Sequence, residues 1–176
     1  QPGDAVLFLS GGTFPDANLV LHNVSGTASQ PIVISTYGGP GTATLVTSGN
    51  APGVQLWNAG GAAISALTVV GPGLIGGASA ECISLYNDGA TAHTYGDIDV
   101  SGVSVAGCSQ GIFVYASQCG AGFTNVTLRD STAAANVHTG IFTTGPGSAC
   151  LPHSGFAVRN VTAYNNTGDP ADTGGH

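Results

Sequence analysis

The sequence FAVRNVTAYNNTG at residues 156–168 closely resembles an earlier stretch, FTNVTLRDS at residues 123–131. Both contain Asn-Val-Thr among residues that are otherwise typical of a β-strand. In FTNVTL and VRNVTA, apolar side chains occupy positions 1, 4 and 6, and the step from 1 to 4 breaks the two-residue period of a strand. The three side chains could face one side only if the chain bends at position 3, where Asn tolerates left-handed backbone angles. We therefore interpret Asn125 and Asn160 as corner residues rather than glycosylation sites, since the sequon alone is a weak pattern.

Two families of short strand segments recur along the chain. The first family has an apolar-x-apolar core, and its members start 29 residues apart, at Gly53, Cys82, Gly111 and Gly140. The second family starts at positions 64, 100, 123 and 158, and its third position is Ala66, Gly102, Asn125 or Asn160. Gly, like Asn, adopts left-handed angles at little cost, so these positions are expected to be bends.

A strand, a bend, a second strand and a loop, repeated along the chain, describe one coil of a parallel solenoid in which inward side chains stack about 4.8 Å apart. An antiparallel sandwich would instead join neighbouring strands by hairpins. Leu19, Ile32 and Leu45 recur at a spacing of 13 residues, which indicates half-coils, and no sustained helical periodicity is present. We predict one all-β domain over residues 1–176, a parallel β-helix of about six coils. Residues 1–52 would form the first coils and residues 53–176 four regular ones.

Composition narrows the class of protein. Only 6% of the 176 residues are charged, and two basic residues stand against nine acidic ones, for a net charge of −7. Such a chain cannot neutralise a row of phosphates, so we expect no nucleic-acid partner. No run of eighteen apolar residues occurs, so we expect no membrane span. The first residue is Gln1 rather than Met, which we interpret as processing or excision.

Four cysteines without CxxC spacing favour two disulfides over a metal cluster, and an oxidising compartment. The sequence therefore predicts a secreted or cell-surface protein. Bonds Cys119–Cys150 and Cys82–Cys108 would each join adjacent coils, as the short reach of a disulfide requires. The two other pairings stay open at this point.

The opening QPGDAVLFLSGGTF (residues 1–14), the following SGTASQPIVISTYGG (residues 25–39) and VRNVTAYNNTG (residues 158–168) resemble coils of the right-handed parallel β-helix proteins of the pectate lyase-like superfamily. The resemblance covers nearly the whole chain. It implies a right-handed parallel β-helix and, by analogy with the secreted polysaccharide lyases of that group, a polysaccharide partner. Members of the group continue for several more coils and carry caps, so this chain is expected to be a fragment without caps, or a piece that stacks on another.

Loop lengths predict where a site would lie. The connections at residues 86–97 and 144–155 are long, and the one between them at residues 115–122 is short. In a solenoid all three emerge at one corner, so the long loops would form the walls of a shallow cleft. The walls would carry Asp88, His93, Tyr95, Asp97 and His153. Asp99 and Arg159 would lie on the adjacent outward strand surface.

These residue types match β-elimination on uronic-acid polymers. That reaction needs the substrate carboxylate neutralised, by Ca²⁺ held on acids or by Arg, and a base such as His, Tyr or Arg. We therefore predict a substrate-binding role for Asp88, Asp97 and Asp99, with Ca²⁺ as the one candidate cofactor. The predicted catalytic residues are His93, Tyr95, His153 and Arg159. The chain lacks the Asp cluster beside a catalytic Arg or Lys of Ca²⁺-dependent pectate lyases, and the Gly-His-Gly of the inverting pectin hydrolases.

Two functions follow. The first is a secreted β-helix domain that binds or processes polysaccharide at the loop-bearing face. The alternative is a structural, adhesin-like module that assembles end to end, because open coil ends present unpaired backbone groups that proteins normally hide or use.

Overall fold

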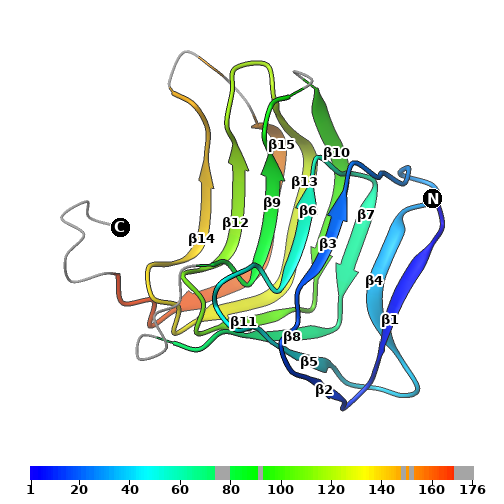
Figure 1. The fold of residues 1–176 in the computed structure, drawn as a ribbon, viewed down its shortest axis with the longest axis vertical. Helices are drawn as coiled ribbons and strands as arrows, with labels where there is room; N and C mark the ends of the chain where they lie inside the picture. The colour runs from blue at the N-terminus through cyan, green and yellow to red at the C-terminus, as the bar shows by residue number, and fades with distance from the viewer. Residues whose placement is uncertain (74–79, 91–92, 148–149, 151–152, 169–176) are drawn as a thin grey trace.

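The chain is described from a computed structural model that covers residues 1–73, 80–90, 93–147, 150 and 153–168. It is a parallel β-solenoid, as the sequence predicts: every strand pair between the described elements is parallel (Figure 1). Each regular turn contributes three strands, as in β7 (Ala62–Ser65), β8 (Leu67–Val70) and β9 (Ile83–Asn87). The solenoid has about five turns rather than about six, and β15 (His153–Tyr164) begins a further one.

The strands form two sheets. Sheet A has ten strands and bends into two wings that meet in the long β13 (Gly122–Ala134). Its first wing holds β1 (Ala5–Leu9), β4 (Ile32–Tyr37), β7 and β10 (Thr94–Ser101). The second wing holds β2 (Thr13–Phe14), β5 (Ala43–Val46), β8 and β11 (Ser104–Ala106), and β15 pairs with β13 along both wings. Sheet B has five strands: β3 (Leu19–His22), β6 (Val54–Trp57), β9, β12 (Gln110–Ala116) and β14 (Thr139–Thr144).

The 29-residue family has the register that the sequence predicts. Val54, Ile83, Ile112 and Ile141 are paired in that order across β6, β9, β12 and β14. The 13-residue spacing near the N-terminus has a different meaning from the one expected. Leu19, Ile32 and Leu45 lie on the successive strands β3, β4 and β5, and a turn contains three strands, so the spacing marks thirds of a coil rather than halves.

The four predicted bend residues all adopt left-handed angles. Ala66, Gly102, Asn125 and Asn160 have φ values of 55°, 59°, 51° and 49°. The amide of Asn125 donates to the Asp97 carboxylate of the preceding turn at 3.2 Å, and that of Asn160 donates to Asp130 at 2.8 Å. Both asparagines therefore turn the chain and bind the turn before, which confirms the corner interpretation.

The four bends belong to two corners, not one. Ala66, Gly102 and Asn160 lie where the two wings of sheet A meet, whereas Asn125 lies at the entrance to the first wing. Val158 accordingly pairs with Leu128, and the alignment of Val158 with Phe123 is wrong. Because both corners require a left-handed residue followed by an inward apolar one, the local pattern cannot tell them apart.

The core is a column of inward aliphatic side chains with Phe123 as its largest fully buried member. Cys82–Cys108 lies inside this column, and Cys119–Cys150 joins the loops after β12 and β14; the two Cα–Cα distances are 5.5 and 5.2 Å. The favoured disulfide pairing is therefore confirmed. Within the described residues no helix has the length and hydropathy needed to cross a bilayer.

Ala66 provides a test of the corner. In the folded protein, a residue with a side chain adopts left-handed angles at a cost of about 1–2 kcal/mol, which Gly avoids. Gly has more conformational freedom in the unfolded chain, however, and this freedom lowers the free energy of unfolding by up to about 1 kcal/mol. We therefore expect Ala66→Gly to raise the free energy of unfolding slightly, by about 0.5 kcal/mol. The control Ala63→Gly, in the interior of the same strand region, should lower it by about 0.5–1 kcal/mol. Urea denaturation of both variants measures the difference, and destabilisation of equal size would contradict the assignment.

Candidate functional site

A continuous row of aromatic side chains runs along the outer face of sheet B, parallel to the solenoid axis. We call it the aromatic row; it consists of His22, Trp57, Tyr86, Tyr115, Phe113 and Phe142. The first four are paired residues on neighbouring strands. Phe113, two residues before Tyr115 on β12, is paired with Phe142 on β14. The row therefore crosses all five strands of sheet B.

The ring contacts in the row are regular. Ring centroids are 4.3 Å apart for His22 and Trp57, and 5.7 Å apart for Trp57 and Tyr86. Tyr86 and Tyr115 stack at 5.6 Å with an interplanar angle of 5°. Phe113 then contacts both Tyr115 and Phe142 at 5.7 Å. The rings at the two ends of the row are exposed and the others half-buried, so the row is an accessible apolar strip.

The 29-residue repeat places these rings. Trp57, Tyr86 and Tyr115 each follow an inward aliphatic residue at the same position of the repeat, and strand alternation turns them outward. The inward apolar positions of the repeat do not by themselves reveal the row, because the rings occupy outward positions. An aromatic residue at the same position of three consecutive coils was the signal that could have revealed it.

Asp88 borders the row, and its carboxylate accepts three hydrogen bonds. It accepts from the backbone N–H of Ala90 at 2.9 Å, the Asn58 amide at 3.0 Å and the Trp57 indole N–H at 3.1 Å. In that order these bonds hold the pKa of Asp88 below its usual range. Asp88 therefore stays ionised and fixes the orientation of the Trp57 ring. This positioning role comes in addition to the contact with substrate that the sequence predicts. Partial burial, and then the charge of Asp88, raise the pKa of Tyr86, so its phenol stays a neutral donor.

The loop corner collects part of the predicted site. Tyr95, Phe123 and His153 are paired on three successive strands, and the His93 ring meets Tyr95 edge-on at 4.7 Å. His153 accepts from the Phe123 backbone N–H at Nδ1, so its Nε2 carries the proton and donates to the Thr144 carbonyl at 2.9 Å. With both ring nitrogens engaged, His153 ties together two turns and is poorly placed to move a proton. His93 is exposed at this corner, whereas Tyr95 is half-buried and packs against the hydrophobic core.

The remaining predicted residues lie on the outer face of the first wing of sheet A. The Arg129 guanidinium donates bidentate hydrogen bonds to the Asp99 carboxylate, with Nε–Oδ1 at 2.9 Å and Nη2–Oδ2 at 3.1 Å. Arg129 was not predicted as a site residue, and its contact with Asp99 depends on pairing between turns. Arg159 is paired with Arg129 on the next strand and makes no ion pair with the described residues.

The predicted group is therefore divided between the loop corner, the border of the aromatic row and the outer face of sheet A. No three His, Cys, Asp or Glu side chains among the described residues are grouped so that they could hold a metal ion. A Ca²⁺ site stays a prediction.

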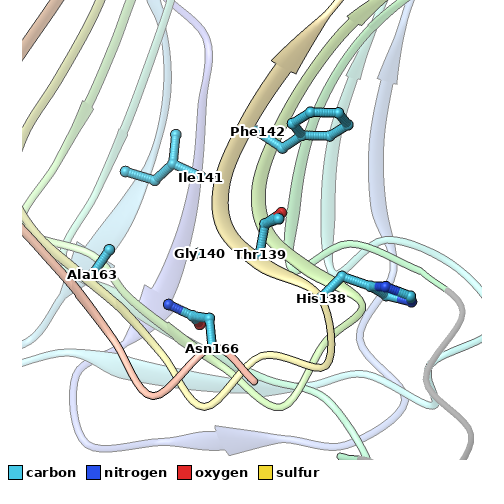
Figure 2. Close-up of a pocket in the computed structure, with 7 residues that line it drawn as sticks. All are labelled: His138, Thr139, Gly140, Ile141, Phe142, Ala163 and Asn166. Atoms are coloured by element: carbon cyan, nitrogen blue, oxygen red, sulfur yellow. The ribbon is translucent and has the colours of Figure 1, made fainter. Parts of the chain in front are cut away.

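Among the described residues, pockets open at both ends of the solenoid. The one at the C-terminal end has a volume of about 460 Å³; Figure 2 shows Ile141 and Phe142 on opposite sides of β14 beside it, with Asn166 below. The one at the N-terminal end has about 400 Å³ and is lined by residues that include Val6, Leu21 and Ile32. The cleft between the long loops includes residues outside the described part of the chain, and it stays a prediction, as does end-to-end assembly.

Comparison with known proteins identifies the fold. No model of a protein family matches the sequence, and no curated protein matches it either. Among solved structures, an alginate lyase from Paenibacillus sp. str. FPU-7 is similar with a TM-score of 0.67 and 20% identity, over 94% of this chain and 53% of the enzyme. A GH136 lacto-N-biosidase from Eubacterium ramulus is similar with a TM-score of 0.66 and 18% identity, over 89% of this chain and 35% of the enzyme. This chain thus spans about half or less of the length of these carbohydrate-active enzymes, and what it shares with them is the parallel β-helix fold.

Proposed function

We propose that this chain is a polysaccharide-binding β-helix domain and that the aromatic row is its binding surface. The observation that carries the proposal is the unbroken contact of six rings along the axis of sheet B, on a face that solvent reaches. Fold similarity to two carbohydrate-active enzymes supports it. The two disulfides are consistent with an oxidising compartment and support secretion or display at the cell surface.

Aromatic rings suit sugars for a physical reason. A pyranose ring presents C–H groups with slight positive charge on its flat faces, and the faces of Trp and Tyr carry slight negative charge. These side chains also have few rotatable bonds, so ordering them on binding costs little entropy. Trp57 is further fixed by its bond to Asp88, so its ring is held in place before any ligand arrives.

A purely structural role for the row is the competing explanation. Stacked rings on neighbouring strands stabilise a sheet by about 0.5–1.5 kcal/mol per pair, whether or not a ligand binds. The two explanations differ in what a substitution changes. Loss of stability alone would indicate a structural row, whereas loss of affinity in a folded protein would indicate a binding surface.

Catalysis on uronic-acid polymers is the second candidate. It is favoured by the contact of His93 with Tyr95 at the loop corner, because Tyr and His are both able to remove a proton next to a carboxylate. The test is the ultraviolet absorbance of unsaturated uronate products, measured on pectate, alginate and glycosaminoglycans. His93→Gln with Tyr95→Phe should abolish any such signal, and a signal that survives both changes would exclude this pair as the base.

Binding can be followed through the one tryptophan of the chain, Trp57. We expect any polysaccharide that binds to the row to change the fluorescence of Trp57. Tyr115→Ala should weaken binding about tenfold, since truncating an aromatic anchor commonly costs more than 1 kcal/mol. Tyr164→Ala is the matched control, because Tyr164 is an exposed Tyr on sheet A, away from the row. Titration calorimetry with both variants, after circular dichroism has shown them folded, gives the comparison; equal affinities would contradict the proposal.

A further inference from the structure

The aromatic row lies on a face without charged strand residues. The five strands of sheet B read LVLH, VQLW, ISLYN, QGIFVYA and TGIFTT, and they contain no Asp, Glu, Lys or Arg. Both arginines of the chain lie in sheet A, on β13 and β15, and Arg129 is already paired with Asp99 and Asp130. A ligand on the row therefore meets no fixed cation from these strands.

Among the described residues, the acid that is hydrogen-bonded to the row has a fixed charge. Asp88 is bonded to the Trp57 indole, and its three hydrogen bonds favour the ionised carboxylate. The whole chain carries a net charge of −7. A carboxylate on a sugar stacked near Trp57 would be repelled by Asp88; the side chain of the row that can offset this repulsion, when it carries a positive charge, is His22, whose ring lies against that of Trp57. A neutral sugar would meet no such penalty.

We infer that the aromatic row selects neutral glycan chains over uronic-acid chains of the same linkage; this inference rests on the proposed function. Attraction comes from the apolar ring faces, and sugar hydroxyls find neutral partners in Gln55 and in the phenols of Tyr86 and Tyr115, which lie outward on the same face. Two unit charges about 4 Å apart in water interact by about 1 kcal/mol, which is about fivefold in affinity. That repulsion is the selective element, because stacking alone does not distinguish a hexose from its uronate.

Matched polymers separate charge from shape. Polygalacturonate, alginate and hyaluronan are each compared with the same polymer after chemical reduction of its carboxyl groups, so that the linkages are unchanged. Binding is measured by Trp57 fluorescence and by calorimetry, at low and at high salt. We expect at least one reduced polymer to bind at least about fivefold more tightly than its parent, and the difference to shrink as salt screens the repulsion.

The outcomes distinguish the inference from the function beneath it. If polymers bind but no reduced polymer binds more tightly than its parent, the selection of neutral chains is overturned and glycan binding stays in place. Failure of all six polymers to bind would overturn both.

Asp88 is tested by its own substitution. Asp88→Asn should reduce the preference for the reduced polymer by about threefold to fivefold, as the ratio of the two affinities. Asp130→Asn is the matched control: it removes the same charge at the corner between the wings of sheet A, where left-handed angles suit Asn and Asn160 retains an acceptor. If both variants changed the ratio equally, overall charge rather than Asp88 would be the cause, and the assignment to Asp88 would fail.

Discussion

Phe123→Ala is expected to lower the free energy of unfolding by about 3–5 kcal/mol, the largest effect of any single substitution considered for this chain. Phe123 has no solvent exposure, and it lies between Tyr95 and His153 on the neighbouring strands. Its ring is 5.9 Å from that of His153. Truncation would remove the transfer free energy of a whole phenyl group and leave a cavity that the paired β-strands cannot collapse to fill.

The matched control is Phe142→Ala, the same chemical change at a side chain that is 38% exposed on sheet B. It should lower the free energy of unfolding by less, about 1–2 kcal/mol, since part of the ring is already in solvent and its loss leaves no enclosed cavity. Denaturation in urea, followed by far-ultraviolet circular dichroism, measures both. Similar losses for the two variants would show that Phe123 is not the central packing residue that its burial indicates.

Removing the buried disulfide is the second large effect. The double substitution Cys82→Ala/Cys108→Ala should lower the free energy of unfolding by about 3 kcal/mol, because it frees a loop closed across 26 residues in the unfolded chain. Both cysteines are fully buried in the core column, so the change also removes packing there. Thermal and urea denaturation under non-reducing conditions give the difference from the parent protein.

The second disulfide offers an internal comparison. Cys119 is exposed in the short loop after β12, so a thiol reductant should open Cys119–Cys150 first and reach Cys82–Cys108 only when the core unfolds. Thiol labelling with mass spectrometry resolves the order. Reduction of both bonds at the same rate in the native protein would contradict the burial of Cys82–Cys108.

The division of the predicted site has one physical cause. Side chains on a solenoid find their partners on the neighbouring turn, about 30 residues away, as Arg129 does with Asp99. Loops of unequal length set that pairing, so the spacing of polar residues in the sequence does not reveal it. The same holds for His153. Its two imidazole nitrogens form hydrogen bonds with the backbone of Phe123 and Thr144 only when β15 is paired with β13.

The sequence by itself determined the parallel solenoid and the left-handed bend residues, and it favoured the disulfide pairing that the structure shows. It could do so because a constant 29-residue period and a left-handed residue before an inward side chain are local requirements, repeated in each coil. Tertiary structure alone decided to which corner Asn125 and Asn160 belong, which charges Arg129 neutralises, and that six rings form one strip. These three features depend on the register between turns and on the face of the sheet from which each side chain projects. Both are set by packing across the whole solenoid.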